Sequence, residues 1–322
     1  MKILYVDYPH NLSEDQTFRY YGDLYRELVK TENVVVHPPG IFDMPSLHQA
    51  GFECIVFGLG YFTQTDLSYY AEQKGLKESN IVKVSMLHKL GHNLQNKVQF
   101  CKDNNFDLIM DPHITYKEHA TQSGCESFRF WFNADPKIFH PREINKLYDV
   151  GFSGASHPNG KERTKNSPTN NLRNRVHQAL LMKDYNIYWN MDPTDKNHKR
   201  ISSLEEYASL MNKSKIWLAT TGPFLDVGPR YFEVMMSKTL LLCNKMPEEY
   251  EGVFIDGYNC VMFENDLSDF YQKLDYYLNN DEERNIIINN AYEFVMANHT
   301  VKNMADKFNQ KIRELKHAKR NL

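Results

Sequence analysis

The stretch KIWLATTGPFLDVGPRYFEVMMSKTLLLCN, residues 215–244, decides the fold, because it contains a strand, a loop, a helix and a second strand in succession. Two apolar runs, at 215–220 and 239–244, flank a helical pattern that extends from about Gly228 to Lys238. Pro229 suits the first turn of that helix, where a backbone N–H has no intrahelical partner. Two apolar strands joined by a helix predict a parallel β-α-β unit.

The same alternation extends over the whole chain. Strands are expected at residues 2–7, 33–37, 53–58, 81–87, 106–111, 127–132, 148–154, 185–190, 215–220, 239–244, 252–255 and 260–263. Helices are expected at residues 13–30, 93–104, 115–124, 170–183, 203–211, 228–238, 267–279, 281–297 and 301–316. The segment 133–146 contains two prolines and mixed charges and is typical of a linker. The sequence therefore predicts an α/β chain with two Rossmann-like, doubly wound domains that face each other across a cleft.

Composition limits the classes of partner and the cell compartment. The length of 322 residues suits two domains, and the net charge of −3 gives no overall field that would attract nucleic acid or an anionic membrane. The five cysteines are widely spaced and form no C-x-x-C motif, which predicts reduced thiols. The N-terminus lacks the features of a signal peptide, and no apolar run is long enough to span a membrane. We expect a soluble, cytoplasmic protein.

Arg230 and Glu233 lie three residues apart, in the first turns of the predicted helix that follows a strand end. An arginine at a helix N-terminus opposes the helix dipole, which a bound phosphate would compensate. A carboxylate one turn further can accept hydrogen bonds from a vicinal diol such as a ribose. The alternative is an i,i+3 ion pair, which contributes about 0.2–0.5 kcal/mol on an exposed face. These residues alone leave both interpretations open.

Four segments of the second half carry a family resemblance, in the family's order. They are FNADPKIFHP (132–141), YDVGFSGA (148–155), PRYFEVMMSKTLLLCN (229–244) and the long segment that begins FIDGYNCVMF and ends ANHT (254–300). Together they resemble the group 1 superfamily of GT-B fold glycosyltransferases, in particular its spore-maturation, CgeB-like branch. The first half matches only in its alternation and in HKLGHN, residues 88–93.

The resemblance implies a domain arrangement and an activity. An acceptor-side domain would occupy residues 1–140, a nucleotide-sugar-binding domain would occupy 141–300, and a C-terminal helix at 301–322 would pack back on the first domain. The enzyme would move a sugar from a UDP or GDP sugar to a hydroxyl of a glycan, a protein or a modified nucleic-acid base. It would retain the anomeric configuration and use neither a metal nor a cofactor. Nucleic acid would be a partner only as an acceptor substrate.

Two other functions remain open. Relatives of this kind carry acidic residues at the positions of Leu225 and Lys89, so the chain could be a catalytically inactive protein that binds nucleotide sugars or glycans on a GT-B scaffold. An epimerase of the same architecture fits the segment 132–141 less well. No G-x-G-x-x-G motif is present, which argues against a nicotinamide dinucleotide site.

The resemblance also assigns candidate residues. Glu233 would face the nucleotide ribose, Arg230 the donor diphosphate, and His88 the reacting sugar. The remaining donor-site candidates are Ser153, Gly154, Lys161, Arg163, Gly222, Asp226, Tyr258 and Asn259. Each has a structural alternative: a polar surface loop for 152–165, a turn between two strands for 257–259, and a core or surface histidine for His88. His113 is a weaker candidate of the same kind. So is His92, whose i,i+4 spacing from His88 also suits metal binding, but Gly91 intervenes and no acidic third ligand follows.

Overall fold

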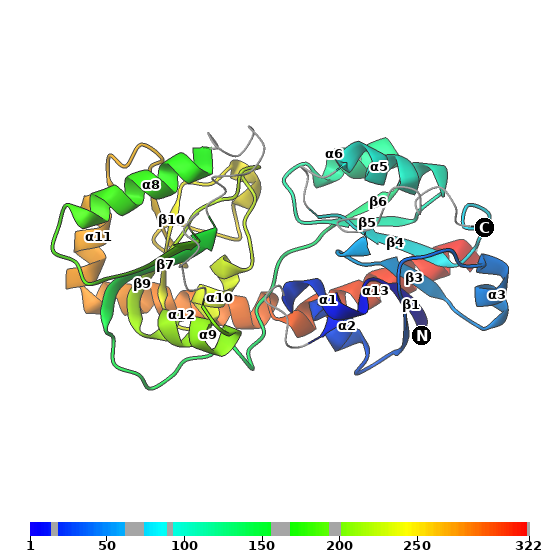
Figure 1. Cartoon of the computed structure of the whole chain (residues 1–322), viewed down its shortest axis with the longest axis horizontal. Helices are drawn as coiled ribbons and strands as arrows, with labels where there is room; N and C mark the ends of the chain where they lie inside the picture. The colour runs from blue at the N-terminus through cyan, green and yellow to red at the C-terminus, as the bar shows by residue number, and fades with distance from the viewer. Residues whose placement is uncertain (14–18, 62–73, 89–92, 156–167, 193–200, 321–322) are drawn as a thin grey trace. The chain divides into compact units, whose positions relative to one another are not determined.

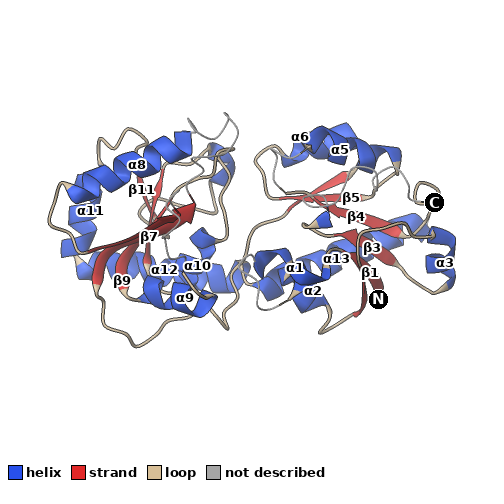
Figure 2. Cartoon of the chain, viewed as in Figure 1, coloured by secondary structure: helices blue, strands red, loops and turns tan. Residues whose placement is uncertain are grey.

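The chain forms two compact α/β units. The computed structural model describes residues 1–13, 19–61, 74–88, 93–155, 168–192 and 201–320. Unit 1 comprises Met1–Trp131 and Val301–Leu322, and unit 2 comprises Phe132–Thr300. Each unit contains one sheet whose paired strands are all parallel, with helices on both faces (Figure 1, Figure 2). This arrangement confirms the predicted class of two Rossmann-like α/β domains.

Unit 1 contains a six-stranded sheet in the order β2-β1-β3-β4-β5-β6. The strands are β1 (Lys2–Val6), β2 (Asn33–His37), β3 (Cys54–Phe57), β4 (Val82–Met86), β5 (Leu108–Asp111) and β6 (Glu126–Arg129). Its helices are α1 (Pro9–Leu12), the 3-10 turn η1 (Arg19–Tyr21), α2 (Asp23–Leu28), α3 (Met44–Gln49), α5 (Leu94–Asp103), α6 (Tyr116–Ser123) and α13 (Val301–Arg320). Helices α5 and α6 cover one face of the sheet, while α2 and α13 cover the other (Figure 1).

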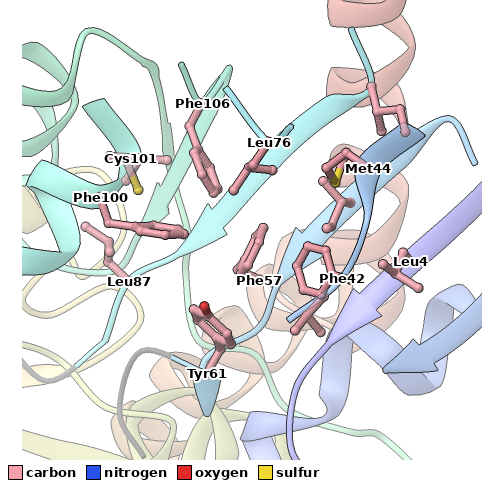
Figure 3. Close-up of a cluster of buried hydrophobic side chains, with 14 of the residues drawn as sticks. Leu4, Phe42, Met44, Phe57, Tyr61, Leu76, Leu87, Phe100, Cys101 and Phe106 are labelled. Carbon is pink, nitrogen blue, oxygen red and sulfur yellow. The ribbon is translucent and has the colours of Figure 1, made fainter. Parts of the chain in front are cut away.

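The core of unit 1 is rich in aromatic residues. Figure 3 shows Phe57 of β3 among Phe42, Tyr61, Phe100 and Phe106. The rings of Phe57 and Tyr61 meet edge to face, with their centroids 4.7 Å apart, an arrangement that aromatic pairs prefer. This packing fixes the strands whose carboxyl ends carry the polar residues described below.

The strand order of unit 1 reverses between β1 and β3, and Asp7 occupies that point. Its carboxylate accepts hydrogen bonds from the backbone N–H of Tyr8 at 2.7 Å, the amide of Asn11 at 3.0 Å and the N–H of Gly60 at 3.0 Å. Burial nevertheless raises the pKa of Asp7 to about 6. A Cβ at Gly60 would come within 2.1 Å of Asp7 Oδ1, so the loop after β3 needs glycine there. Asp7 thus joins the loops that follow β1 and β3.

Unit 2 contains a five-stranded sheet in the order β11-β10-β9-β7-β8. The strands are β7 (Tyr148–Ala155), β8 (Ile187–Asp192), β9 (Ser214–Ala219), β10 (Leu240–Asn244) and β11 (Val261–Phe263). Its helices are α8 (Pro168–Leu181), α9 (Leu204–Asn212), α10 (Arg230–Met236), the 3-10 turn η3 (Glu248–Tyr250), α11 (Phe270–Asn279) and α12 (Asp281–Asn298). Helices α8 and α11 lie on one face of the sheet, and α9, α10 and α12 lie on the other (Figure 1).

Helix α13 is amphipathic and returns the chain to unit 1. Its buried side chains recur every three or four residues and face α2 and β4: Val301, Met304, Ala305, Phe308, Ile312 and Leu315. Its polar face carries Lys311 and Lys316, which form ion pairs with Glu126 and Glu53. The apolar stripe, rather than these partly exposed ion pairs, fixes the helix on unit 1.

Two expectations about local structure were wrong. The helix expected over residues 13–30 is interrupted, because α2 begins only at Asp23 and Gly22 packs so closely on α1 that a Cβ would lie 2.9 Å from Asn11 O. The strand expected at 252–255 is a turn, which the side chain of Asn259 holds by bonding Ile255 N at 2.8 Å and Val253 O at 2.8 Å. The short helix α3 was not anticipated.

Candidate functional site

The strand order of unit 2 reverses between β7 and β9, and the carboxyl ends of these strands carry the candidate site. Ligands of open α/β sheets bind at such a reversal point. Strand β7 ends in Phe152, Ser153, Gly154 and Ala155 and is followed by α8, while β9 leads through Thr220 and Thr221 to the loop before α10. The side chains of α8 and α10 that meet at this point therefore define the site.

Two arginines converge on Phe152. The Cζ of Arg173, from α8, lies 5.8 Å from the centroid of the Phe152 ring, and the Cζ of Arg230, from α10, lies 5.9 Å from it. Phe152 is fully buried, so the ring gives the two guanidinium groups an apolar floor on which cations can rest. We call Arg173 and Arg230 the arginine pair.

The positive charges of the arginine pair are close enough to interact. Only 8% of Arg173 is exposed, and burial, followed by the charge of Arg230, lowers its pKa to about 10. Its Nε donates a hydrogen bond to Thr220 Oγ1 at 2.7 Å. A folded protein that places two cations together in a desolvated position bears a cost, and a bound dianion would remove that cost.

Arg230 is held by a tyrosine. Its Nε donates to the hydroxyl of Tyr207 at 2.9 Å. Burial lowers the pKa of Arg230, but Tyr207 and the negative charge of Glu233 raise it by more, so the guanidinium stays charged. Within the described part of the chain Arg230 forms no ion pair with a carboxylate at hydrogen-bonding distance. The i,i+3 ion pair with Glu233, which was the alternative to a ligand site, is therefore not formed.

The loop between β9 and α10 places Asp226 beside the arginine pair. Gly222 N donates to Asp226 O at 2.7 Å, and a Cβ on Gly222 would lie 2.4 Å from Asp226 Oδ1. Asp226 Oδ1 is buried and accepts no hydrogen bond from the described residues, and the carboxylate charge raises the pKa of Arg173. Leu225, with a φ of 60°, is held in the left-handed region, which is costly for a branched side chain. The turn is strained, as turns at functional sites often are.

Two residues of this site were missed from the sequence. Arg173 lies three residues before Val176 and seven before Leu180, both buried, and thus on the apolar stripe of α8. A charged arginine on the apolar stripe of a helix is unusual, and this feature of the sequence could have identified Arg173. The hydroxyl of Tyr231 is buried next to Arg173 without a hydrogen-bond partner among the described residues, and nothing in its sequence context distinguishes it from a core residue.

The other predicted donor-site residues are distributed unevenly. Gly154 lies at the arginine pair, where a Cβ would be 3.6 Å from Arg173 Nη1, and Ser153 is half-buried next to it. Tyr258 is exposed, whereas the Asn259 side chain is fully buried and bonds the backbone of its own turn. Lys161 and Arg163 lie outside the described residues.

Unit 1 carries a second polar group of residues at the carboxyl ends of β4 and β5. His88 follows β4, and its ring is stacked on that of His113 with centroids 6.4 Å apart. Its Nε2 lies 3.4 Å from the hydroxyl of Tyr20, and its backbone carbonyl accepts a hydrogen bond from the buried Lys97. His88 is therefore neither an isolated core residue nor a simple surface residue. Its neighbours Lys89, Gly91 and His92 lie outside the described residues.

Two kinds of feature are absent from the described part of the chain. No group of three or more histidine, cysteine and acidic side chains there has an arrangement that could hold a metal ion. None of its helices combines the length and the apolar character needed to cross a bilayer.

Comparisons with known proteins agree with this architecture. Residues 165–310 match the family model described as Glycosyl transferase-like. HepE of Anabaena, solved in complex with UDP-glucose, has a similar structure with a TM-score of 0.60 and 12% identity, over 98% of this chain and 100% of that one. Sucrose-phosphate synthase of Thermosynechococcus elongatus gives a TM-score of 0.64 and 10% identity, over 99% and 100%. No curated protein sequence matches the chain.

At such low identity, structural likeness establishes the fold and not the substrate. The CgeB-like branch stays a prediction. The two sheets and their strand orders show a GT-B fold, and residues 165–310 match the glycosyl transferase-like family model.

Proposed function

We propose that this protein is a glycosyltransferase that moves a sugar from a nucleoside diphosphate sugar to a hydroxyl-bearing acceptor. The observation that carries the proposal is the arginine pair: two desolvated cations on the Phe152 ring, at the point where ligands of such sheets bind. A diphosphate is the dianionic group that matches them. HepE, which shares the fold, was solved with UDP and with UDP-glucose, which favours a UDP-type donor over a GDP-type donor.

The arginine pair would act on the leaving group. When the bond between the anomeric carbon and the diphosphate oxygen breaks, its electrons leave with the diphosphate and negative charge develops there. Arg173 and Arg230 are already in place and already desolvated, so they would stabilise that charge without reorganisation. Because the cations come from the protein, we propose that the reaction needs no divalent metal and no cofactor. Retention of the anomeric configuration is proposed from the family resemblance alone.

The neighbouring residues take roles around the diphosphate. Glu233 would accept hydrogen bonds from the ribose hydroxyls, one helical turn beyond Arg230. Ser153 and Gly154 would approach the phosphates, since the absence of a Cβ at Gly154 keeps the backbone accessible next to Arg173. Asp226 would balance the charge of Arg173 until the donor binds. Lys161 and Arg163 remain proposed phosphate ligands. Tyr258 would line the site, and Asn259 would hold its turn.

The second candidate is a non-catalytic protein that binds nucleotide sugars or glycans. It is favoured by one observation: Leu225, an exposed apolar residue, stands where an acidic residue was expected from the resemblance. Both candidates bind the donor, but only the enzyme consumes it.

A thermal-shift screen of nucleotide sugars, followed by measurement of released nucleoside diphosphate, tests the proposal. A ligand that binds only the native state raises the melting temperature. We expect a shift with UDP-sugars and the release of UDP, and we expect Arg230→Ala to abolish that release while its circular dichroism spectrum stays native. A shift without any release would favour the binding protein. No shift with any nucleotide sugar would refute both.

A further inference from the structure

Unit 1 contains a carboxylate shared by two histidines. Asp111, the last residue of β5, is fully buried. Its Oδ1 accepts hydrogen bonds from His113 Nδ1 at 2.5 Å and from His113 N at 2.9 Å, while its Oδ2 accepts one from His119 Nδ1 of α6. Burial raises the pKa of Asp111, but the hydrogen bonds of His113 and His119 outweigh it and lower the pKa to about 2. Asp111 is therefore ionised and can only accept.

This geometry fixes which nitrogen of each ring carries the proton. Since an ionised Asp111 can only accept, Nδ1 of both histidines must be N–H. The Nε2 of His119 is within hydrogen-bonding distance of Thr115 Oγ1, at 3.2 Å. The Nε2 of His113 makes no hydrogen bond in the part of the chain that the structure describes. In neutral His113 this nitrogen is a lone-pair acceptor, in a side chain that is only 3% exposed.

The surroundings of His113 are aromatic and polar. His88 stacks on its ring, and the rings of Tyr20 and Tyr21 meet His88 edge to face at 5.7 and 5.6 Å. Arg129 of β6, beside Asp111 in the strand register, lies with its Cζ 4.1 Å from the centroid of the Trp131 ring. Aromatic faces next to a hydrogen-bond acceptor suit a sugar, which presents apolar C–H faces and hydroxyl donors.

We propose that unit 1 binds a carbohydrate, with Nε2 of His113 accepting a hydrogen bond from a sugar hydroxyl. Asp111 is a positioning residue that holds the required tautomer, and His119 holds Asp111. This proposal rests on the proposed glycosyltransferase function, because it names the acceptor of that reaction as a glycan rather than a protein or a nucleic-acid base. The binding event itself needs no donor, so it can be tested alone.

The probes are the methyl α-glycosides of glucose, galactose and mannose, measured by saturation-transfer NMR with the full-length protein. We expect at least one glycoside to bind. His113→Phe keeps a ring but removes the acceptor, and should weaken that binding roughly 5-fold, the effect of one neutral hydrogen bond. His113→Gln restores an acceptor oxygen and should recover part of it. His48→Phe, an exposed histidine of α3, is the matched control and should bind as the wild type does.

A second measurement does not depend on the choice of glycoside. Long-range 15N NMR spectra at neutral pH should show His113 with its proton on Nδ1, and Asp111→Asn should change that tautomer. An Nε2–H tautomer in the wild type, no binding of any glycoside, or equal binding by His113→Phe would each overturn the proposal. UDP affinity, measured by calorimetry on the same samples, separates the outcomes: glycoside binding lost with UDP binding intact refutes only this inference, whereas absent UDP binding refutes the proposed function.

Discussion

Replacing Arg173 with methionine should stabilise the free protein and weaken donor binding at the same time. Burial and the charge of Arg230 lower the pKa of Arg173 from its ordinary 12.5 to about 10. At about 1.4 kcal/mol for each pH unit, holding the guanidinium charged in the folded state costs about 3 kcal/mol. Methionine fills a similar volume without a charge. The lost hydrogen bond to Thr220 offsets about 1 kcal/mol of the gain, and other contacts of the side chain offset some more.

The expected net gain is therefore about 1–2 kcal/mol in the free energy of unfolding, and a rise of roughly 2–8 °C in the melting temperature of a unit of this size. The same change should have the opposite effect on UDP binding. A hydrogen bond between charged groups contributes about 1.5–3 kcal/mol, so Arg173→Met should weaken UDP binding roughly 10- to 100-fold. Functional side chains often lower the stability of the free protein while they raise its affinity for the ligand, and Arg173 should follow this pattern.

Calorimetric titration with UDP and thermal melting of the free protein measure the two effects. Arg175→Met is the matched control, because Arg175 lies two residues further along α8 and, among the described residues, donates to the backbone carbonyls of Asn265 and Asp266. That change should leave UDP affinity unaltered and should not raise the melting temperature. If Arg173→Met melts lower than the wild type and binds UDP as tightly, Arg173 is a structural residue and the reasoning fails.

Three further changes test other parts of the structure. Gly222→Ala would bring a Cβ within 2.4 Å of Asp226 Oδ1 and should weaken UDP binding. Gly228→Ala, which has open space around its Cβ, is the control and should not weaken it. Equal UDP affinities of the two variants would contradict this prediction. Because the pKa of Asp7 is raised to about 6 in the folded protein, its contribution to stability is present below pH 4 and is lost as the pH rises through 6. The free energy of unfolding, measured with urea, should therefore fall by up to about 3 kcal/mol over this range. Asp7→Asn should remove this dependence on pH. Asn259→Ala breaks two partly buried hydrogen bonds and should lower the free energy of unfolding by about 2 kcal/mol in thermal melts. An unchanged melting temperature would mean that the turn is held by other contacts.

The fold could be predicted from the sequence because apolar strand-like runs and amphipathic helical stretches alternate along the chain. Apolar runs such as 239–244 and amphipathic stretches such as 301–316 each report one local structure, and their alternation requires parallel sheets. Errors arose where a side chain decides the local backbone. The apolar segment 252–255 has the composition of a strand, but Asn259, several residues away, bonds its backbone and holds it as a turn.

The site was only partly readable, for a different reason. Arg230 and Gly222 stand out in the sequence because they surround a strand end and a helix start. Arg173 is far from both in sequence, and its proximity to Arg230 depends on how α8 and α10 pack around Phe152. The Asp111–His113 contact is local, but the preference for one tautomer follows from the ionised state of Asp111. That state depends on a second hydrogen bond, from His119 of α6, which no motif reports.

The central claim is that the arginine pair binds the diphosphate of a nucleotide donor, and calorimetry with uridine, UMP and UDP tests it most directly. The wild type should bind UDP more tightly than UMP, and UMP more tightly than uridine, because each phosphate adds charge at the pair. The double variant Arg173→Met/Arg230→Met should bind all three with similar, weak affinity. A double variant that still prefers UDP, or a wild type that binds uridine as tightly as UDP, would contradict the account.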